Sequence, residues 1–478
     1  MNKGKVCISV CAETADQLIR QIHRAEKLAD VIEVRFDCLD TVDSQTLADV
    51  ATHLATRPLI STFRPREQGG HRELTIEQRL AFWKNAGESR LIDIEEDIAA
   101  ETSYLSSTRI CSYHDFAGVP DDIDSIFDRL ADTGAEILKI AVGVEDAAAA
   151  IPVWKLLLRA KNKGKHVIPV AMGEAGKWTR ILGLAHGSLL TYASLETGSE
   201  TAPGQISAKD MREVYRVNQL AHDTKVFGIV GDPVSQSLSP YMHNPAFVAR
   251  GINAVFVPFL VKDLGTFLTR MVRPETSEAG LDFGGLSVTM PHKQTILKYI
   301  DNIDETALAI GAVNTVKVDE GRLTGYNTDA HGFITPLKKA FGDLRRARVA
   351  VFGAGGAARA CVFALKREGS DVTVFVRNLQ KAERFAKEFD VPIDLIENAR
   401  PGDFAIVVDA TPFGMKGDLE NKTLFTADEL AGVRFVYDLV TKPTDTPIIR
   451  EAKDAGIPCI GGIDMLVSQG VEQFRIWT

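Results

Sequence analysis

The sequence predicts an α/β protein that begins with a (β/α)8 barrel and continues with a two-domain unit, one domain of which has a Rossmann fold. Three observations support this prediction. Eight short apolar runs alternate with helical patterns in the first half of the chain. A new buried strand at Lys225 directly follows an amphipathic helix, which places a domain boundary near residue 222. Further on, a strand that begins at Arg348 runs into a glycine-rich turn.

Length and composition indicate an ordinary globular protein. The chain has 478 residues, which is more than one compact core usually holds. The formal net charge of −9 leaves no basic stripe for nucleic acid, and no uncharged run is long enough to span a bilayer. Six scattered cysteines without a CxxC pair suggest reduced thiols, and the first strand begins too early for a signal peptide. We therefore expect a cytoplasmic protein with small-molecule partners, and the sequence does not specify its oligomeric state.

The apolar runs of the first half each precede a segment that can be helical, as a barrel of typical size requires. They are Val6–Val10, Val31–Phe36, Pro58–Phe63, Leu91–Ile94, Thr108–Tyr113, Ile137–Val142, His166–Ala171 and Leu189–Leu195. In such a barrel, chemistry belongs at the carboxyl ends of the strands. The polar residues at these ends are Glu33, Arg35, Arg64, His114, Lys139 and, after the seventh strand, Arg180. We expect them to share one mouth.

Lys139 is the most informative of these residues because it interrupts an otherwise apolar strand. Burial disfavours the charged amine, and a neutral amine can attack a ketone to form an imine. His114 could be the proton shuttle for the reaction of that imine. The alternatives are a structural lysine paired with a barrel carboxylate such as Glu33, and a structural histidine.

Three arginines around one mouth, Arg35, Arg64 and Arg180, suggest an anionic, hydroxylated substrate, because guanidinium groups bind carboxylates bidentately. The histidines of this half lack HxH or HExxH spacing, so we expect no metal site. Gly69-Gly70 could let a loop fold over the substrate or could be only a turn.

The first half closes with a turn and a helix. Thr201-Ala-Pro-Gly-Gln205 is a turn that has a polar side chain at each end. Ser207 and Asp210 form a capping-box signature, and apolar residues at three-residue spacing predict a helix that continues to Leu220.

These segments together resemble type I 3-dehydroquinate dehydratase over the whole first half. The matching motifs are Glu33-Val-Arg35, Phe63-Arg64, Ser112-Tyr-His114-Asp-Phe, Leu138-Lys139-Ile-Ala-Val and Ala202-Pro-Gly-Gln-Ile-Ser207. The resemblance implies that Lys139 is the Schiff-base lysine and His114 the acid/base. It also implies substrate contacts for Glu33, Arg35, Arg64, Arg180, Thr201 and Gln205. The family loop often reads Glu-Gly-Gly, whereas this one reads Glu67-Gln68-Gly69-Gly70, so the role of Glu67 stays open.

The second half contains two regions. Strand-like runs alternate with helical stretches from Lys225 to about Asn327, as in a smaller α/β domain. These runs are Val226–Val230, Ala254–Phe259, Gly284–Val288 and Ala312–Val318.

The second region begins as a dinucleotide-binding unit. After the strand 348–352, Gly353-Ala354-Gly355-Gly356-Ala357-Ala358 follows the GxGxxG pattern but has alanine at the last glycine position. The next strand, Asp371–Val376, ends in Arg377 instead of an acid. An arginine there suits the 2′-phosphate of NADP, whereas an acid would suit the ribose of NAD. The alternative is a solvated loop arginine.

Lys293 and Asp329 could form a pair that moves a proton during hydride transfer, or they could form only a salt bridge. Their surroundings resemble shikimate dehydrogenase. The matching motifs are Gly231-Asp-Pro-Val-Ser-Gln-Ser-Leu-Ser-Pro240, Val288-Thr289 with Pro291, Gly311-Ala-Val-Asn314-Thr, Gly325-Tyr-Asn-Thr-Asp329, Gly353-Ala-Gly-Gly-Ala-Ala-Arg359, and Gly462 with Met465-Leu-Val-Ser-Gln469.

That resemblance implies a catalytic Lys293/Asp329 pair. It implies substrate contacts for Ser237, Ser239, Thr289, Asn314 and Gln469, and cofactor contacts for Gly353, Ala354, Gly355, Gly356, Ala357, Arg377 and Thr411. Ser287 and Thr441 depart from residues common in the family, which bears on substrate affinity.

The sequence therefore predicts a bifunctional enzyme of the shikimate pathway. The first half would dehydrate 3-dehydroquinate through a lysine Schiff base, and the second would reduce 3-dehydroshikimate with NADPH and without a metal. The expected domains are a barrel (1–222), a substrate domain (225–330, joined by a helix at about 460–478) and an NADP-binding domain (331–459). Two alternatives stay open: a quinate/shikimate dehydrogenase that works oxidatively, or one half that only binds a metabolite.

Overall fold

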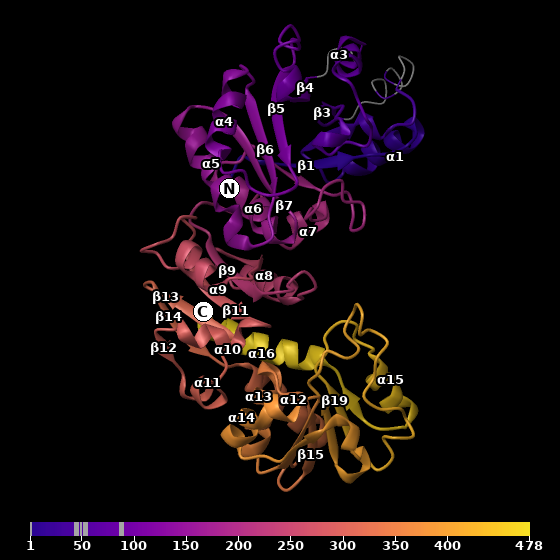
Figure 1. Ribbon diagram of the computed structural model, residues 1–478, viewed down its shortest axis with the longest axis vertical. Helices are drawn as coiled ribbons and strands as arrows, with labels where there is room; N and C mark the ends of the chain where they lie inside the picture. Colours follow the sequence, from indigo (N-terminus) through magenta and orange to yellow (C-terminus); the bar gives the residue numbers. More distant parts are fainter. Residues whose placement is uncertain (1, 43–46, 48–49, 51–55, 86–89) are drawn as a thin grey trace. The chain divides into compact units, whose positions relative to one another are not determined.

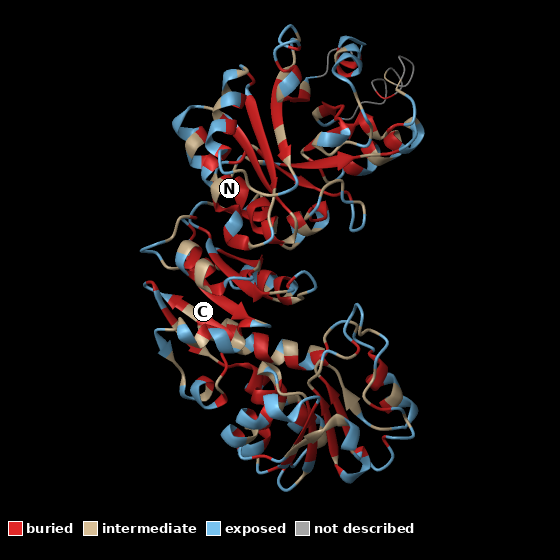
Figure 2. Ribbon diagram, viewed as in Figure 1, coloured by how far each residue is buried: buried red, intermediate tan, exposed pale blue. Residues whose placement is uncertain are grey.

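The computed structural model describes residues 2–42, 47, 50, 56–85 and 90–478 (Figure 1). The chain folds into two compact units, Met1–Gly228 with Asn244–Phe283, and Ile229–His243 with Gly284–Thr478. Most strands of the barrel and of the central part of each sheet are buried, and helices are exposed on their outer sides (Figure 2). Within the part of the chain that the structure describes, no helix has the length and apolar character needed to cross a membrane.

The predicted (β/α)8 barrel is confirmed. Its eight strands pair in parallel in the order β7-β6-β5-β4-β3-β2-β1-β8, and a hydrogen bond of 3.4 Å from Leu189 N to Val167 O links the two ends of this order. The strands are β1 (Lys5–Val10), β2 (Val31–Arg35), β3 (Leu59–Thr62), β4 (Leu91–Glu95), β5 (Thr108–Asp115), β6 (Ile137–Gly143), β7 (His166–Met172) and β8 (Leu190–Ala193).

Helices cover the outside of the barrel. Those described are α1 (Ala15–Ala25), α3 (Ile76–Asn85), α4 (Ile123–Asp132), α5 (Ile151–Asn162), α6 (Lys177–Leu182) and α7 (Ala208–Glu213). Helix α1 shows why these segments are helical and lie against the barrel. The Thr14 side chain caps its first turn, and Leu18, Ile22 and Ala25 recur on one buried face.

The barrel interior has an apolar base and a polar mouth. Successive side chains of a strand alternate between the two faces of the sheet, so Ile137, Lys139 and Ala141 of β6 all point inward. The apolar inward residues form one core cluster that includes Ile60 and Ile168. This alternation carries Lys139 into the barrel.

The helix predicted to continue to Leu220 is wrong beyond Glu213. Ser207 does cap α7, and its hydroxyl accepts a hydrogen bond from Asp210 N at 3.1 Å. The helix then stops, and Arg216 adopts a positive φ of 52°. The amide of Asn2 donates to the carbonyls of Val217 and Leu220 instead. The apolar spacing reflects burial, not a helix.

A second sheet follows in the order β10-β9-β11-β13-β14-β12. Its strands are β9 (Lys225–Gly231), β10 (Ala254–Leu260), β11 (Phe283–Val288), β12 (Asn302–Ile303), β13 (Thr315–Asp319) and β14 (Arg322–Tyr326). Strand β14 was not predicted, and β13 begins after Asn314, not at Ala312. Glu320 and Gly321, both at positive φ, form the two-residue turn that reverses the chain between β13 and β14. The helices here are α8 (Ser239–Ala249), α9 (Leu264–Phe267), α10 (His292–Thr295) and α11 (Glu305–Ile310).

The third sheet is parallel, in the order β17-β16-β15-β18-β19-β20, as the Rossmann prediction requires. Its strands are β15 (Arg348–Phe352), β16 (Asp371–Val376), β17 (Ile393–Leu395), β18 (Ile406–Asp409), β19 (Phe435–Asp438) and β20 (Cys459–Ile460). Its helices are α12 (Asp329–Phe341), α13 (Gly356–Arg367), α14 (Leu379–Phe389), α15 (Pro447–Asp454) and α16 (Gly462–Trp477).

Both faces of the third sheet are covered. In β15, Val349 and Val351 join one core cluster with residues of α12 and α13, while Ala350 and Phe352 join the other with residues of α15. A strand that is apolar on both faces is typical of a parallel sheet.

The expectation that all six cysteines are reduced is wrong for two of them. Cys11, which follows β1, and Cys38, which ends the short helix η1 (Phe36–Cys38) after β2, form a disulfide. The other four are free. No motif in the sequence joins these two cysteines, because they meet only through the pairing of neighbouring strands.

Candidate active sites

A pocket lies at the carboxyl ends of the barrel strands. All eight residues that the sequence placed there line it: Glu33, Arg35, Arg64, His114, Lys139, Arg180, Thr201 and Gln205. Other residues that line the pocket were not predicted to do so, among them Ser9, Gln68 and Tyr192. Ser9 had a usable signal, because it is a polar residue in an apolar strand, and its hydroxyl donates to Glu33.

Lys139 is paired within this pocket. Its Nζ lies 2.8 Å from Asp93 Oδ2, 3.7 Å from Glu33 Oε1 and 4.3 Å from the centre of the Tyr192 ring. The sequence favoured an imine-forming lysine over a structural lysine paired with a barrel carboxylate such as Glu33. The structure pairs Lys139 with Glu33 and, more closely, with Asp93, which was not predicted. Although burial alone would raise it, Arg64 and Lys139 hold the pKa of Asp93 well below its ordinary value. Asp93 is therefore an ionised carboxylate that holds the Lys139 amine in place.

His114 presents a neutral ring to the same pocket. Burial lowers the pKa of His114 well below its ordinary value, and the cations of Arg64 and Lys139 lower it further. Arg64 Nη1 lies 2.5 Å from His114 Nε2, and because a guanidinium only donates, Nε2 accepts. The ring hydrogen is then on Nδ1, which has no hydrogen-bond partner among the described residues. A neutral imidazole of this kind can exchange a proton with a bound molecule.

A buried chain of charges fixes Arg64. Its guanidinium lies 2.7 Å from Asp93 Oδ1 and 3.3 Å from Glu95 Oε1, and Arg79 lies 3.1 Å from the other oxygen of Glu95. Burial raises the pKa of Glu95 to about 7. Asp93 and Glu95 are spaced by two in β4, so both face inward, and this spacing of charges was an available signal.

Arg180 is buried without a carboxylate partner among the described residues. Its Nη2 donates to Pro203 O at 3.2 Å, and its Nε has no partner. Burial lowers the pKa of Arg180 to about 10. An uncompensated guanidinium that lines a pocket is suited to an anion supplied by a ligand.

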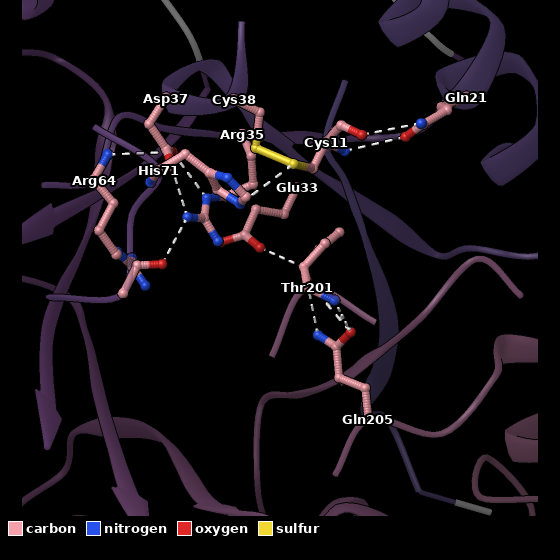
Figure 3. The surroundings of a disulfide bond; sticks show 12 residues. Cys11, Gln21, Glu33, Arg35, Asp37, Cys38, Arg64, His71, Thr201 and Gln205 are labelled. Atoms are coloured by element: carbon pink, nitrogen blue, oxygen red, sulfur yellow. Dashed lines mark hydrogen bonds and ion pairs between the residues drawn. A yellow bond between two sulfur atoms is a disulfide. The ribbon is translucent and has the colours of Figure 1, made fainter. Parts of the chain in front are cut away.

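Two loops complete the mouth. In one, Gln68 lines the pocket and accepts from His114 N at 3.1 Å, whereas Glu67 is exposed. In the other, Thr201 N donates to Gln205 Oε1 at 2.9 Å (Figure 3). The second loop needs Gly204, at φ 75°, because a Cβ there would lie 2.1 Å from the carbonyl oxygen of Gly173.

In the second unit, Lys293 and Asp329 meet. Lys293 Nζ lies 2.5 Å from Asp329 Oδ2, and Asn314 Nδ2 donates to the other carboxylate oxygen at 2.7 Å. Asn314 Nδ2 also lies 3.3 Å from Gln469 Oε1 on α16. Asp329 is buried and Lys293 is half-buried. This cluster holds an amine and a carboxylate close enough for a proton to pass between them.

The remaining predicted substrate contacts lie on adjoining loops. Thr289 follows β11, and its backbone N–H donates to Val230 O at 2.9 Å, which places it beside the end of β9. Ser237 and Ser239 follow on that strand's loop, where Ser239 N donates to Ser237 Oγ at 3.2 Å. Ser287, a departure from the family pattern, accepts from Gln473 Nε2 at 3.1 Å, so it supports α16.

The predicted cofactor residues gather at the carboxyl edge of the third sheet. Because Phe352 pairs with both Phe375 and Asp409, the residues after β15, β16 and β18 reach the same edge. These residues include Gly353, Ala354, Gly355, Gly356 and Ala357, as well as Arg377 and Thr411. The edge between β15 and β18 is where the chain order of such a sheet reverses, which is the usual place for a dinucleotide.

The glycine-rich loop fits a pyrophosphate. Gly353 has φ 106°, and Gly355, which precedes α13, has open space where a Cβ would project. Gly356 lies against Lys293, whose Cδ would be 3.0 Å from a Cβ there, so the loop adjoins the catalytic candidates. Arg377 is exposed after β16. Arg359 of the same motif donates to Ile310 O at 2.6 Å and is structural.

Asp409, at the end of β18, gives a testable pH dependence. Burial, and secondly Asp438, raise the pKa of Asp409 from 3.8 to about 8. The folded state therefore binds more protons than the unfolded state, and stability falls as pH rises through this range. We expect Asp409→Asn to raise Tm by about 4 °C or more at pH 9, with the gain disappearing toward pH 4.

Calorimetry of wild type and variant at both pH values measures this, with Asp403→Asn, an exposed acid, as control. A gain of equal size at pH 4 and pH 9 would contradict the titration of Asp409.

Family models match consecutive parts of the chain. Type I 3-dehydroquinase matches residues 6–222. The shikimate dehydrogenase substrate binding domain matches residues 229–316, shikimate / quinate 5-dehydrogenase matches 336–407, and the shikimate 5'-dehydrogenase C-terminal domain matches 462–478.

Relatives span the whole chain or its second half. A protein of Arabidopsis thaliana named bifunctional 3-dehydroquinate dehydratase/shikimate dehydrogenase, chloroplastic, is 33% identical over 511 residues, covering 100% of this chain and 82% of the relative. A shikimate dehydrogenase (NADP(+)) of Methanothermobacter thermautotrophicus is 40% identical over 272 residues, covering 53% and 91%. A crystal structure of shikimate dehydrogenase in complex with NADP+ has a TM-score of 0.50 and 36% identity, covering 54% of this chain and 92% of the other. The chain therefore belongs to the family of bifunctional 3-dehydroquinate dehydratase/shikimate dehydrogenases.

Proposed function

We propose that the barrel pocket dehydrates 3-dehydroquinate through an imine on Lys139. The neutral amine of Lys139, oriented by Asp93, attacks the ketone carbon, and the ketone oxygen leaves as one water. Neutral His114 then removes the proton next to the imine carbon and returns it to the leaving hydroxyl, so that a second water departs. Hydrolysis of the imine consumes one water and frees Lys139. The observation that carries this proposal is the buried Lys139 in one pocket with a neutral His114 and with Arg180, which has no carboxylate partner among the described residues.

We assign the roles of the other pocket residues from the charge and the hydroxyl groups of the substrate. Arg180 binds the carboxylate, because it is the buried cation that lacks a carboxylate partner within the described chain. Glu33, Arg35, Arg64, Thr201 and Gln205 surround the hydroxyls. Arg64 also holds His114 Nε2, and it must release this nitrogen when His114 acts as the base.

We propose that the second unit reduces 3-dehydroshikimate to shikimate. NADPH supplies the hydride when bound, and the loop 353–357, Thr411 and Arg377 would hold it. Lys293 gives a proton to the ketone oxygen as it becomes an alcohol, and Asp329 orients the amine at 2.5 Å. Asn314, Thr289 and Gln469 bind ring hydroxyls, and Ser237 and Ser239 bind the carboxylate.

The same proposal divides the chain at residues 222 and 330, with α16 as part of the substrate domain. Support comes from two side chains of α16. Gln469 lies beside Asn314, and Gln473 donates to Thr315 Oγ1 at 3.0 Å. The NADP-binding domain would then run from 331 to 459.

One coupled assay tests both reactions. The purified chain is mixed with 3-dehydroquinate and NADPH, and both the consumption of NADPH and the formation of shikimate are followed. We expect one NADPH to be consumed per shikimate formed. Consumption of 3-dehydroquinate without oxidation of NADPH would contradict the second assignment, and no consumption at all would contradict the first.

Arg377 predicts the choice of cofactor. Arg377→Asp removes the cation offered to the 2′-phosphate and puts a negative charge in its place, so we expect the KM for NADP to rise by about tenfold or more and the KM for NAD to change little. Steady-state shikimate oxidation with each cofactor measures this. Arg345→Asp, an exposed arginine before β15, is the matched control. An equal rise in the KM for both cofactors would mean that Arg377 does not bind the 2′-phosphate.

A further inference from the structure

Three soft ligands meet at the barrel rim outside the dehydratase pocket. Cys11 follows β1, Cys38 lies after β2 and His71 lies after β3, so three neighbouring strands each supply one residue (Figure 3). None of the three lines the pocket. The histidine spacing in the sequence gave no sign of this group, because its members come from three separate loops.

The positions of the ligand atoms suit a tetrahedral metal. One atom from each residue lies within 4.8 Å of the others, and Cys11 Sγ lies 3.7 Å from His71 Nε2. Zinc binds sulfur at about 2.3 Å and imidazole nitrogen at about 2.0 Å, which puts the two ligand atoms about 3.5 Å apart at a tetrahedral angle. His71 Nε2 therefore already lies at the distance from Cys11 Sγ that a shared metal requires, and the two bonded sulfurs must separate before both can bind.

The surrounding contacts hold the backbone of Cys11 and of His71 and do not use the His71 ring. Asp37 accepts from His71 N at 3.0 Å, and its carboxylate is itself fixed by Arg35. Gln21 binds both the N–H and the carbonyl of Cys11. His71 is exposed, so water can occupy a fourth position.

We propose that Cys11, Cys38 and His71 form a binding site for a thiophilic divalent cation such as Zn²⁺, and that the disulfide closes this site. In the disulfide neither sulfur is a thiolate, and the thiolate is the metal-binding form of cysteine. Reduction adds two electrons and two protons and yields two thiols. Metal binding then releases both thiol protons.

The reductant in the test is a phosphine, which becomes a phosphine oxide by taking its oxygen from water as the disulfide becomes two thiols. After its removal, Zn²⁺ is titrated against a chromophoric chelator, and Co²⁺ is used to look for a sulfur-to-cobalt charge-transfer band. We expect the reduced chain to bind one Zn²⁺ and show the band, and the oxidised chain to do neither.

Matched variants identify the ligands. Cys38→Ser should abolish the tight site, and His71→Ala should weaken Zn²⁺ binding by about tenfold or more. Cys459→Ser, which removes a free and half-buried thiol elsewhere, should bind as wild type does. Dehydratase turnover and the circular dichroism of each variant report whether the barrel is folded. Binding that is the same in the oxidised chain or in Cys38→Ser, or that is unchanged in His71→Ala, would overturn the proposal.

Discussion

Lys139→Ala should lower dehydratase kcat by about a thousandfold or more, because no other buried amine in the described pocket can form the imine. The loss is read as consumption of 3-dehydroquinate. Borohydride added to the wild type with 3-dehydroquinate should leave a stable secondary amine on the peptide that contains Lys139. Lys165→Ala, at the opposite end of the barrel, is the control.

In Lys139→Ala, a loss of activity caused by unfolding must be distinguished from a loss caused by the missing amine. Removing the cation leaves Asp93 and Glu33 buried without it, and breaking a buried pair costs about 3–5 kcal/mol. The borohydride adduct is therefore the decisive second measurement, since it uses the intact chain. Near-normal turnover by Lys139→Ala, or an adduct on another lysine, would remove Lys139 from its proposed role.

Lys293→Ala should lower shikimate oxidation by about a hundredfold or more and leave dehydration unchanged. Lys293 is the amine that faces Asp329, and a positioned acid or base contributes about 10²–10⁴ in rate. The two activities are measured separately on the same preparation. Asp329→Asn tests the partner with nearly the same shape.

Lys298→Ala is the control for this variant, because Lys298 is an exposed lysine five residues further along the chain. A parallel fall of both activities in Lys293→Ala would show that the substitution disturbs folding. An unchanged dehydrogenase would show that Lys293 does not carry the proton.

The predicted barrel residues line one pocket, in part because strand periodicity decides which side chains point inward. Lys139 was found as a charge in an apolar strand, and the same reasoning applied to β4 would have found Asp93 and Glu95. Which carboxylate approaches Lys139 most closely was not predictable, since it depends on strand register. A sequence pattern does not contain distances between strands.

Two other differences between the prediction and the structure also arise from contacts between residues that are distant in the sequence. The segment after α7 has helical spacing but is held by Asn2, a residue more than two hundred positions away. Cys11 and Cys38 were expected to be thiols because their spacing matches no motif, yet neighbouring strands bring them together. Local patterns predict local structure, and partners distant in the sequence override them.

The place of Gln469 has a consequence for synthesis of the protein on the ribosome. Every side chain of the dehydratase pocket has been added to the growing chain once Gln205 is in place. The cluster around Asn314 has to wait for a partner 155 residues later. A nascent or prematurely terminated chain can thus acquire the first activity without the second, and a stop codon before α16 would separate the two reactions without altering any other residue of the dehydrogenase cluster.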